Sequence, residues 1–480
     1  MACRDLHEFM TALEEAGELK RIAEPVSPVL EIAEISHRVV KKGGPALLFT
    51  NVSGYGTPVL TNILGNRRRV EMSLGAGPEV VAGRLASLLQ LPASPAGLVD
   101  KIRALPRLAE LASFFPRVVR RGPCQEVVAD DFSLEALPVL QCWPRDAGRF
   151  ITLPLVFTRD PDTGARNVGM YRLQVYDSRT TGMHWHRHKD GAAIFSRYRE
   201  RQQRMEVAVA LGADPVTIYA ATAPLPPGMD ELLLAGFLRQ EPVELVRCRT
   251  VDLEVPAHAE IVLEGYVEPG EERLEGPFGD HTGYYSPADM YPVFHVTCLT
   301  RRREPVYPAT VVGRPPMEDA FLGEITERVF LPLIKMQLPE VVDMHLPAEG
   351  VFHNLAVVAI RKSYPGQARK VMHALWGLGQ MMFTKVIAVV DADVDVHDLA
   401  EVRWRVLANM DPQQDLVVTA GPLDALEHAS PVPGYGGHLG IDATRKLPEE
   451  GHPRPWPEEI TMSAEITRRV NEKWSRLGLE

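Results

Sequence analysis

The sequence lacks the cysteine pattern of a disulfide scaffold or a zinc ribbon. It has only five cysteines in 480 residues, an odd number without any CxxC pair, at Cys3, Cys124, Cys142, Cys248 and Cys298. Small secreted domains are instead dense in cysteine, and zinc ribbons space their cysteines in close pairs. We therefore expect a protein of a reducing compartment, located in the cytoplasm.

Long apolar runs and an excess of positive charge are also missing. No stretch approaches the roughly 18 consecutive apolar residues of a membrane-spanning helix, and the opening MACRDLHEFM lacks the apolar core of a signal peptide. The formal net charge is −11, whereas a general nucleic-acid binder needs a basic face. The sequence predicts a soluble protein with no membrane span and no nucleic-acid partner.

The length predicts two or three domains, because single hydrophobic cores stop growing at roughly 250–300 residues. Apolar positions between Leu6 and Leu19 recur near helical spacing, which predicts an amphipathic opening helix. The run PALLFTNV at 45–52 is bounded by glycines and predicts a buried strand. The first domain is therefore expected to combine helices and strands.

The middle of the chain is rich in short β-type runs separated by turn residues. Their spacing predicts a β-barrel or split barrel, interrupted by one helix at 231–240. The runs lie at 151–158, 168–176, 205–211, 216–222, 259–267 and 292–300.

Strand and helix patterns alternate after residue 351, which predicts a parallel α/β layer. Strands are expected at 356–360, 385–393 and 415–420, and helices at 368–377 and 399–409. The last segment, SAEITRRVNEKWSRLGLE, has an apolar stripe at Ile466, Val470 and Trp474. We expect this terminal helix to pack on a neighbouring subunit.

Two motifs, one acidic and one rich in glycine, do not match the ligand-binding loops that they resemble. DADVDVHDLAE (391–401) resembles a calcium loop, but Val396 and Val402 stand where the loop needs glycine and glutamate. GYGGHLG (434–440) matches neither dinucleotide nor P-loop spacing. It is interpreted either as a tight loop or as a mobile loop beside an active site.

MHWHRHK (183–189) contains three histidines at alternate positions, His184, His186 and His188. On a strand all three would share one face, where histidines commonly contact a metal or an anion. The alternative is a solvent-facing stripe with one structural histidine. Spacing alone leaves both interpretations open.

Arg172 lies in VGMYRLQVY (168–176), among mostly apolar neighbours. An unpaired guanidinium would be costly to bury, so Arg172 needs an anion. A salt bridge within the protein satisfies that need, and so does a bidentate clamp on a carboxylate substrate.

EGPFGDHTGYY (275–285) places Glu275 and Asp280 on either side of a Gly-Pro-Phe-Gly turn. Two carboxylates that face one cavity repel each other, and repulsion with desolvation leaves one of them able to deliver a proton. The alternative is an exposed acidic turn.

At these residues the sequence resembles the UbiD family of prenylated-flavin-dependent decarboxylases. The resemblance runs nearly end to end and includes the following motifs: ELKRI, GGPALLF, NVGMYR (167–172), VPAHAEIVLEGY (255–266), EGPFGDHTGYY, VVGRPPMED (311–319) and GIDATRK (440–446).

The resemblance implies an α/β multidomain fold with a central flavin-reductase-like split β-barrel. The expected domains are an N-terminal α/β domain (1–115), the flavin-binding barrel (116–310), a C-terminal α/β domain (311–460) and a swapping oligomerisation helix (461–480). It also implies a homo-oligomer, either a dimer or a hexamer.

The same resemblance assigns ligands by position. Asn167, His188 and Glu231 match the family's metal ligands, which hold Mn2+ or Mg2+ against the flavin phosphate, and K+ is a further candidate ion. Only His188 of the three histidines is then a metal ligand. The positions that match flavin contacts are Met170, Tyr171, Arg172, His184, Trp185, His186, Lys189 and Asp190.

For catalysis, the resemblance implies that Asp280 protonates the product carbon while Arg172 and Glu275 position it. The expected reaction is the reversible, non-oxidative decarboxylation of an aromatic acid, with a flavin prenyltransferase as cofactor supplier. GMHWHRHKDG and GIDATRKLPEEG are similar to the menaquinone-biosynthesis branch, which favours a dihydroxynaphthoate, and hydroxybenzoates are the other candidates.

Three alternatives stay open at this point. One is the 4-hydroxy-3-polyprenylbenzoate decarboxylase of ubiquinone biosynthesis, although that branch carries Arg-Trp-Leu where this chain has His184-Trp185-His186. A second is a flavin-free metal-dependent enzyme built on the three histidines. The third is a non-catalytic flavin- or partner-binding module, which the presence of both Glu275 and Asp280 disfavours.

Overall fold

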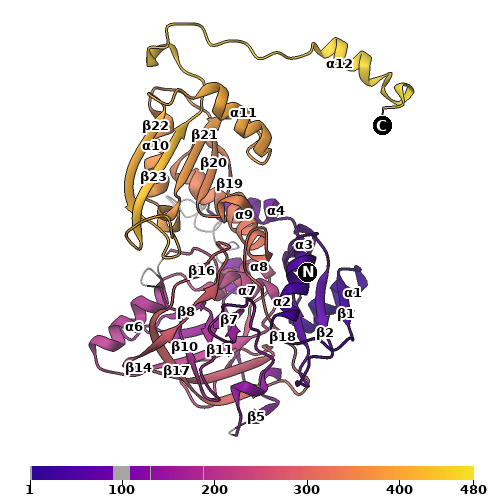
Figure 1. Cartoon of the computed structure of the whole chain (residues 1–480), viewed down its shortest axis with the longest axis vertical. Coiled ribbons are helices and arrows are strands. Elements are labelled where there is room, and N and C mark those ends of the chain that lie inside the picture. The colour runs from indigo at the N-terminus through magenta and orange to yellow at the C-terminus, as the bar shows by residue number, and fades with distance from the viewer. Residues whose placement is uncertain (1–2, 90–108, 130, 187–188, 227, 480) are drawn as a thin grey trace.

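The structure is a computed structural model, and it describes residues 3–89, 109–129, 131–186, 189–226 and 228–479. In Figure 1 the N-terminal elements lie beside a central β-rich body, and the C-terminal α/β region lies above it. None of the helices in these described ranges is both long and apolar enough to cross a membrane.

The N-terminal region packs helices on a small mixed sheet of order β1-β2-β3-β18. The first helix is capped by Asp5, whose carboxylate accepts from Glu8 N at 2.9 Å. It ends before Gly17, which adopts a positive φ, so Leu19 belongs to the following strand rather than to the helix. The elements are α1 (Leu6–Glu15), β1 (Leu19–Ile22), α2 (Glu31–Val40), β2 (Ala46–Phe49), β3 (Val59–Thr61), α3 (Arg67–Leu74), α4 (Pro78–Leu89) and β18 (Tyr307–Pro308).

The central region is built on an antiparallel sheet of order β10-β17-β14-β11-β7-β8, with β5 pairing on β17. No pairing between its edge strands closes the sheet within the described part of the chain. The strands are β5 (Val127–Ala129), β7 (Pro154–Arg159), β8 (Arg166–Met170), β10 (Thr180–Gly182), β11 (Met205–Leu211), β14 (Ile261–Glu275) and β17 (Asp289–Arg301).

Both faces of this sheet are buried. Alternate residues of each strand point to opposite sides, and the two sides belong to two different clusters of buried residues. Leu155 and Phe157 of β7 pack towards α7 and α8, whereas Val156 packs on the face covered by α6. The remaining elements are β4 (Arg117–Val119), β6 (Phe150–Ile151), β9 (Leu173–Gln174), α6 (Asp190–Glu200), α7 (Pro215–Ala220), α8 (Glu231–Arg239), β12 (Glu244–Arg247), β13 (Glu254–Pro256), β15 (Phe278–Gly279) and β16 (Tyr285–Ser286).

The β-type run at 216–222 was wrongly predicted as strand, since it forms α7. Pro215 occupies the first turn, and the Asp214 carboxylate accepts from Thr217 N at 3.0 Å and from Thr217 Oγ1 at 2.6 Å. These helix-start signals outweigh the β-branched composition of a short buried run.

The C-terminal region is a sheet of order β19-β20-β21-β23-β22, in which β20, β21 and β23 are parallel. Helix α10 covers one face and α11 the other, as the two clusters of buried residues show. The elements are α9 (Glu318–Gln337), β19 (Val341–His345), β20 (Leu355–Ile360), α10 (Gln367–Trp376), β21 (Val386–Asp391), α11 (Leu399–Asn409), β22 (Leu416–Pro422), β23 (Tyr435–Asp442) and α12 (Ala464–Asn471).

GYGGHLG is neither a tight loop nor a mobile loop, because most of it forms β23 between β21 and β22. Gly440 allows α10 to pack closely, since a Cβ there would lie 2.5 Å from Met372 Sδ. Short 3-10 helices complete the chain at Pro123–Gln125, Leu134–Ala136, Ala348–Gly350, Gly379–Phe383, Pro448–Glu450 and Trp474–Leu477.

The last segment leaves the C-terminal region and carries α12 away from the rest of the molecule (Figure 1). Every residue of α12 is exposed, including Ile466 and Val470.

Candidate active site

Arg172 stands at the centre of a buried ionic network, in the short link between β8 and β9. Its Nε donates to Glu275 Oε1 at 2.9 Å, and its Nη2 lies 3.3 Å from Glu275 Oε2. Its Nη1 pairs with Asp280, and Nη2 also donates to Ser286 Oγ at 3.0 Å. The guanidinium therefore bridges both acids of the EGPFGDHTGYY motif.

The loop between the two acids is held by fixed hydrogen bonds. Gly276 N donates to Gln174 Oε1 at 2.8 Å, and Gly279 N donates to Asp146 Oδ1 at 2.7 Å. Gly276 has a φ of 91°, a conformation that favours glycine. The Phe278 ring lies under the Arg172 guanidinium, 4.5 Å from centroid to Cζ. These contacts fix both acids on one side of Arg172.

The network holds both acids in their ionised form. Burial alone would raise the pKa of Glu275, yet the hydrogen bond from His184 and the charge of Arg172 lower it. Burial is likewise outweighed at Asp280, whose pKa is lowered by Arg172 and by His281. Two carboxylates on one guanidinium leave the resting network with a net charge of about −1.

His184 and His186 extend the network through a chain of hydrogen bonds. His184 Nδ1 lies 2.7 Å from Glu275 Oε2, and its Nε2 lies 2.5 Å from His186 Nε2. Because an ionised Glu275 can only accept, His184 donates from Nδ1 and accepts at Nε2. Burial lowers the pKa of both rings, that of His186 to about 3, so both are neutral near pH 7.

A second histidine pair joins the central region to the C-terminal region. His281 Nδ1 lies 2.8 Å from Asp280 Oδ1, and its Nε2 lies 3.3 Å from His353 Nε2. The Phe352 ring stacks on His281 at 5.5 Å. Asp280 is thus the first member of a hydrogen-bonded chain that crosses between the two regions.

Four of the predicted flavin contacts, Tyr171, Trp185, Lys189 and Asp190, lie in or beside the first turn of α6. Tyr171 Oη accepts from Gly191 N at 3.3 Å, and the Trp185 ring packs on Tyr171 and Phe195. Lys189 is the residue before α6 and donates to Gln380 Oε1 at 3.4 Å. Met170 ends β8, and Asp190 is the exposed first residue of α6.

This surface has features that fit an anionic cofactor. Trp185 Nε1 is a buried donor without a hydrogen-bond partner among the described residues, and an indole N–H of this kind needs an acceptor. Lys189 adds a cation beside the amides at the start of α6, an arrangement that suits a phosphate.

Two of the three predicted metal ligands are brought together. Asn167 lies on β8, Glu231 begins α8, and Val168 N donates to Glu231 Oε2 at 3.0 Å. Burial raises the pKa of Glu231 to about 7, and the nearby Asp230 and Asp190 add to that rise. A buried carboxylate among other acids fits a divalent cation. His188 lies outside the described residues.

Sequence reasoning missed three residues of this site, Ser286, His353 and Phe352, and gave no role to His281. Ser286 and His281 lie in or beside the recognised motif, so the motif itself was a signal for them. His353 and Phe352 approach from the C-terminal region, and no local pattern links them to Asp280.

Comparison with known proteins finds family matches along most of the chain. Residues 10–89, 117–315 and 320–443 match, respectively, the N-terminal, Rift-related and C-terminal domains described for 3-octaprenyl-4-hydroxybenzoate carboxy-lyase, UbiD. An uncharacterized protein of Archaeoglobus fulgidus is 52% identical over 99% of both chains.

Two solved structures extend the likeness to three dimensions. An evolved dimeric form of the UbiD-class enzyme HmfF from Pelotomaculum thermopropionicum, in complex with prFMN, is 31% identical with a TM-score of 0.80, covering 98% of this chain and 100% of that one. The closed form of vanillic acid decarboxylase from Sedimentibacter hydroxybenzoicus is 28% identical with a TM-score of 0.86, covering 100% of both chains. These matches confirm the predicted mixed α/β multidomain fold, and the chain belongs to the UbiD family of carboxy-lyases, the enzymes that remove CO2 from their substrates.

Proposed function

We propose that the protein decarboxylates an aromatic carboxylic acid with prenylated FMN, in a reaction that is reversible. The observation that carries this proposal is the Arg172–Glu275–Asp280 network, which joins a carboxylate-binding cation to two acids in one buried site. The bound cofactor would accept the electron density that remains on the substrate when the bond to CO2 breaks.

Arg172 is proposed to position the substrate carboxylate. A third anion beside Glu275 and Asp280 would leave three negative charges around one guanidinium, and this repulsion favours protonation of one acid. Asp280 is the better candidate for protonation, because His281 lies at hydrogen-bond distance from its Oδ1 and can deliver a proton there. Glu275 instead keeps its two bonds to Arg172. Substrate entry would therefore load Asp280 with the proton that the product carbon later receives.

His281 is proposed to supply that proton. Burial would lower its pKa, but the hydrogen bond and charge of Asp280 raise it above the usual value. His353 has a pKa lowered to about 4 by burial, so it is a neutral acceptor for His281 Nε2–H. Protonated His281 can pass the proton on its Nδ1 to Asp280 and become neutral, with its Nε2–H still bonded to His353.

Asn167, His188 and Glu231 are proposed to hold Mn2+ or Mg2+ beside the cofactor phosphate, and K+ is a further candidate ion. Met170, Tyr171, His184, Trp185, His186, Lys189 and Asp190 would surround the flavin. The acidic surroundings of Glu231 support these assignments, as does Trp185 Nε1, which has no hydrogen-bond partner among the described residues.

The substrate class is proposed to be a dihydroxynaphthoate or a hydroxybenzoate, with the polyprenylated hydroxybenzoate of ubiquinone biosynthesis as the alternative. The protein is proposed to be cytoplasmic, which the absence of any disulfide among its five cysteines supports. A flavin prenyltransferase would supply its cofactor.

The proposed assembly is a dimer or hexamer in which α12 packs on a neighbouring copy. Ile466, Val470 and Trp474 are between 37% and 46% exposed on a segment that leaves the body of the molecule. Burying this stripe on a second chain would remove apolar surface from water.

The test is to co-express the chain with a flavin prenyltransferase and to measure CO2 release over a panel of aromatic acids. The expected result is a perturbed flavin absorbance and release of CO2 from at least one dihydroxynaphthoate or hydroxybenzoate. A purified protein that carries the modified flavin and decarboxylates no member of the panel would contradict the proposal. Metal analysis of His184→Ala and His186→Ala tests the flavin-free alternative, which requires that both variants lose the metal.

A further inference from the structure

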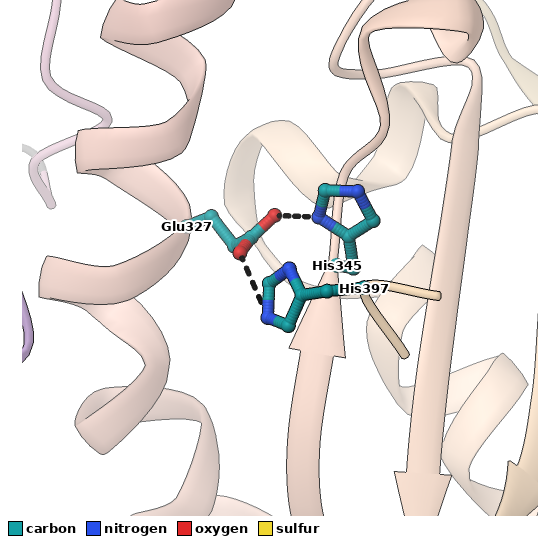
Figure 2. A group of neighbouring side chains, drawn as sticks. All are labelled: Glu327, His345 and His397. Carbon is teal, nitrogen blue, oxygen red and sulfur yellow. Dashed lines mark hydrogen bonds and ion pairs between the residues drawn. The ribbon is translucent and has the colours of Figure 1, made fainter. Parts of the chain in front are cut away.

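A second group of potential metal ligands lies in the C-terminal region, and it shares no residue with the proposed catalytic, flavin or metal sites. Glu327 of α9, His345 at the end of β19 and His397 before α11 present ligand atoms that all lie within 4.8 Å of one another. Figure 2 shows the two imidazole rings turned towards the Glu327 carboxylate. The three residues come from a helix, a strand and a turn that lie apart in the sequence, and only the tertiary fold brings them together.

Glu327 is the buried member of the group, with 1% of its surface exposed. His345 Nδ1 lies 2.8 Å from its Oε2, which also accepts from the Leu346 amide. Arg328 lies 2.7 Å from its Oε1 without hydrogen-bond geometry. A buried carboxylate oxygen in this position has capacity left for another positive partner.

His397 has the geometry of a ligand rather than that of a hydrogen-bond partner. Its Nε2 lies 3.9 Å from Glu327 Oε1 and 3.8 Å from Asp343 Oδ2. Both separations exceed hydrogen-bond length. Ligand atoms of a tetrahedral zinc site with bonds of about 2.0–2.1 Å lie about 3.3 Å apart, and small side-chain rotations reach that spacing from the observed 2.8, 3.8 and 3.9 Å.

The local charge also suits a divalent cation. The carboxylates of Glu327 and Asp343 outweigh the single guanidinium of Arg328, which pairs with both. Two imidazole nitrogens beside carboxylate oxygens are donors that favour zinc over Mg2+ or Ca2+.

We propose that Glu327, His345 and His397 bind a zinc-type divalent cation, with Asp343 or water as the fourth ligand. The ion would fasten α9 to the C-terminal sheet and to the segment before α11. Helix α9 also carries Asp319, whose charge acts on His281, two helical turns before Glu327. The ion would therefore steady the helix that leads from the candidate active site into the C-terminal region.

The test measures zinc bound to the full-length chain in a Glu231→Gln background, so that zinc at the proposed flavin-side site does not contribute. The protein is loaded with excess Zn2+, dialysed against a weak chelator and analysed for metal content. We expect about one zinc per chain, and a visible absorption band typical of four-coordinate Co2+ when cobalt replaces zinc.

The deciding comparison is His397→Ala against His373→Ala. His397 is 42% exposed, so its loss leaves no buried cavity, and His373 is an exposed histidine of α10 in the same region. We expect His397→Ala to weaken zinc binding at least about tenfold and to abolish a zinc-dependent rise in melting temperature, while His373→Ala retains both. Equal zinc binding by the parent and His397→Ala, or no zinc retained by the parent, would overturn the proposal.

Discussion

His281 and His353 face each other across the boundary between the central sheet and the C-terminal region, with their Nε2 atoms 3.3 Å apart. The pKa of His281 is raised by Asp280, whereas that of His353 is lowered to about 4 by burial. One ring can therefore donate to the other, and the contact depends on the protonation of His281.

This dependence predicts how stability changes with pH. A raised folded-state pKa contributes stability that is fully present below the unfolded value of 6.5 and is lost as pH rises through the folded value. The melting temperature of the parent should therefore exceed that of His281→Gln at pH 6 and below, and the difference should shrink at alkaline pH. A pH-independent difference would contradict this assignment.

His353→Ala should reduce kcat with little change in KM, because it removes the proposed partner of His281 without touching Arg172. The loss is expected to be about 10²-fold, the lower end of the range for a proton-transfer group. Measurement of kcat across pH checks this, with His373→Ala as the control. A change confined to KM would instead indicate a role in binding.

Asp280→Asn should remove the proposed proton donor while keeping a side chain of nearly the same size and shape. We expect kcat to fall by about 10²–10⁴-fold, with flavin binding retained in the absorbance spectrum. Full activity in this variant would show that another group protonates the product.

Arg172→Lys keeps a positive charge but loses the fork that engages both carboxylates. Activity should fall sharply, and Arg172→Met should additionally destabilise the fold by about 3–5 kcal/mol, because it leaves buried charges unpaired. Denaturant unfolding of both variants tests this. Arg38→Lys, which changes an exposed pair with Glu34, is the matched control and should be nearly neutral.

Glu231→Gln should weaken Mn2+ binding by at least about tenfold, since it removes the charge of a proposed oxygen ligand. Manganese content after dialysis is the measurement, and Glu241→Gln, an exposed position just after α8, is the control. Equal manganese in both variants would contradict the ligand assignment.

Gly265→Ala should destabilise the central sheet. Gly265 lies at a register shift between β14 and β17, and a Cβ there would lie 1.9 Å from the carbonyl oxygen of His295. Relieving that overlap is expected to cost about 1–3 kcal/mol. Gly437→Ala in β23, where the nearest atom would be 3.9 Å away, should change the unfolding free energy much less.

The sequence alone determined the family and the order of the regions, and it placed Glu275 and Asp280 in one motif, because contiguous motifs and local periodicity carry this information. Local patterns gave the wrong secondary structure where a short apolar run was compatible with both a strand and a helix. At 216–222 the composition predicted a strand, but Asp214 and Pro215 began a helix. They also failed at 434–440, where strand pairing rather than glycine content decided the structure.

Only the tertiary structure decided which side chains meet. It paired Arg172 with both acids, turned His184 and His186 towards each other, and brought His353 to His281 from 72 residues away. It also gathered Glu327, His345 and His397 from three elements. Contacts of this kind depend on how distant elements pack. A local sequence pattern shows only which face of its own helix or strand a side chain occupies, and it does not show which distant residue that face will meet.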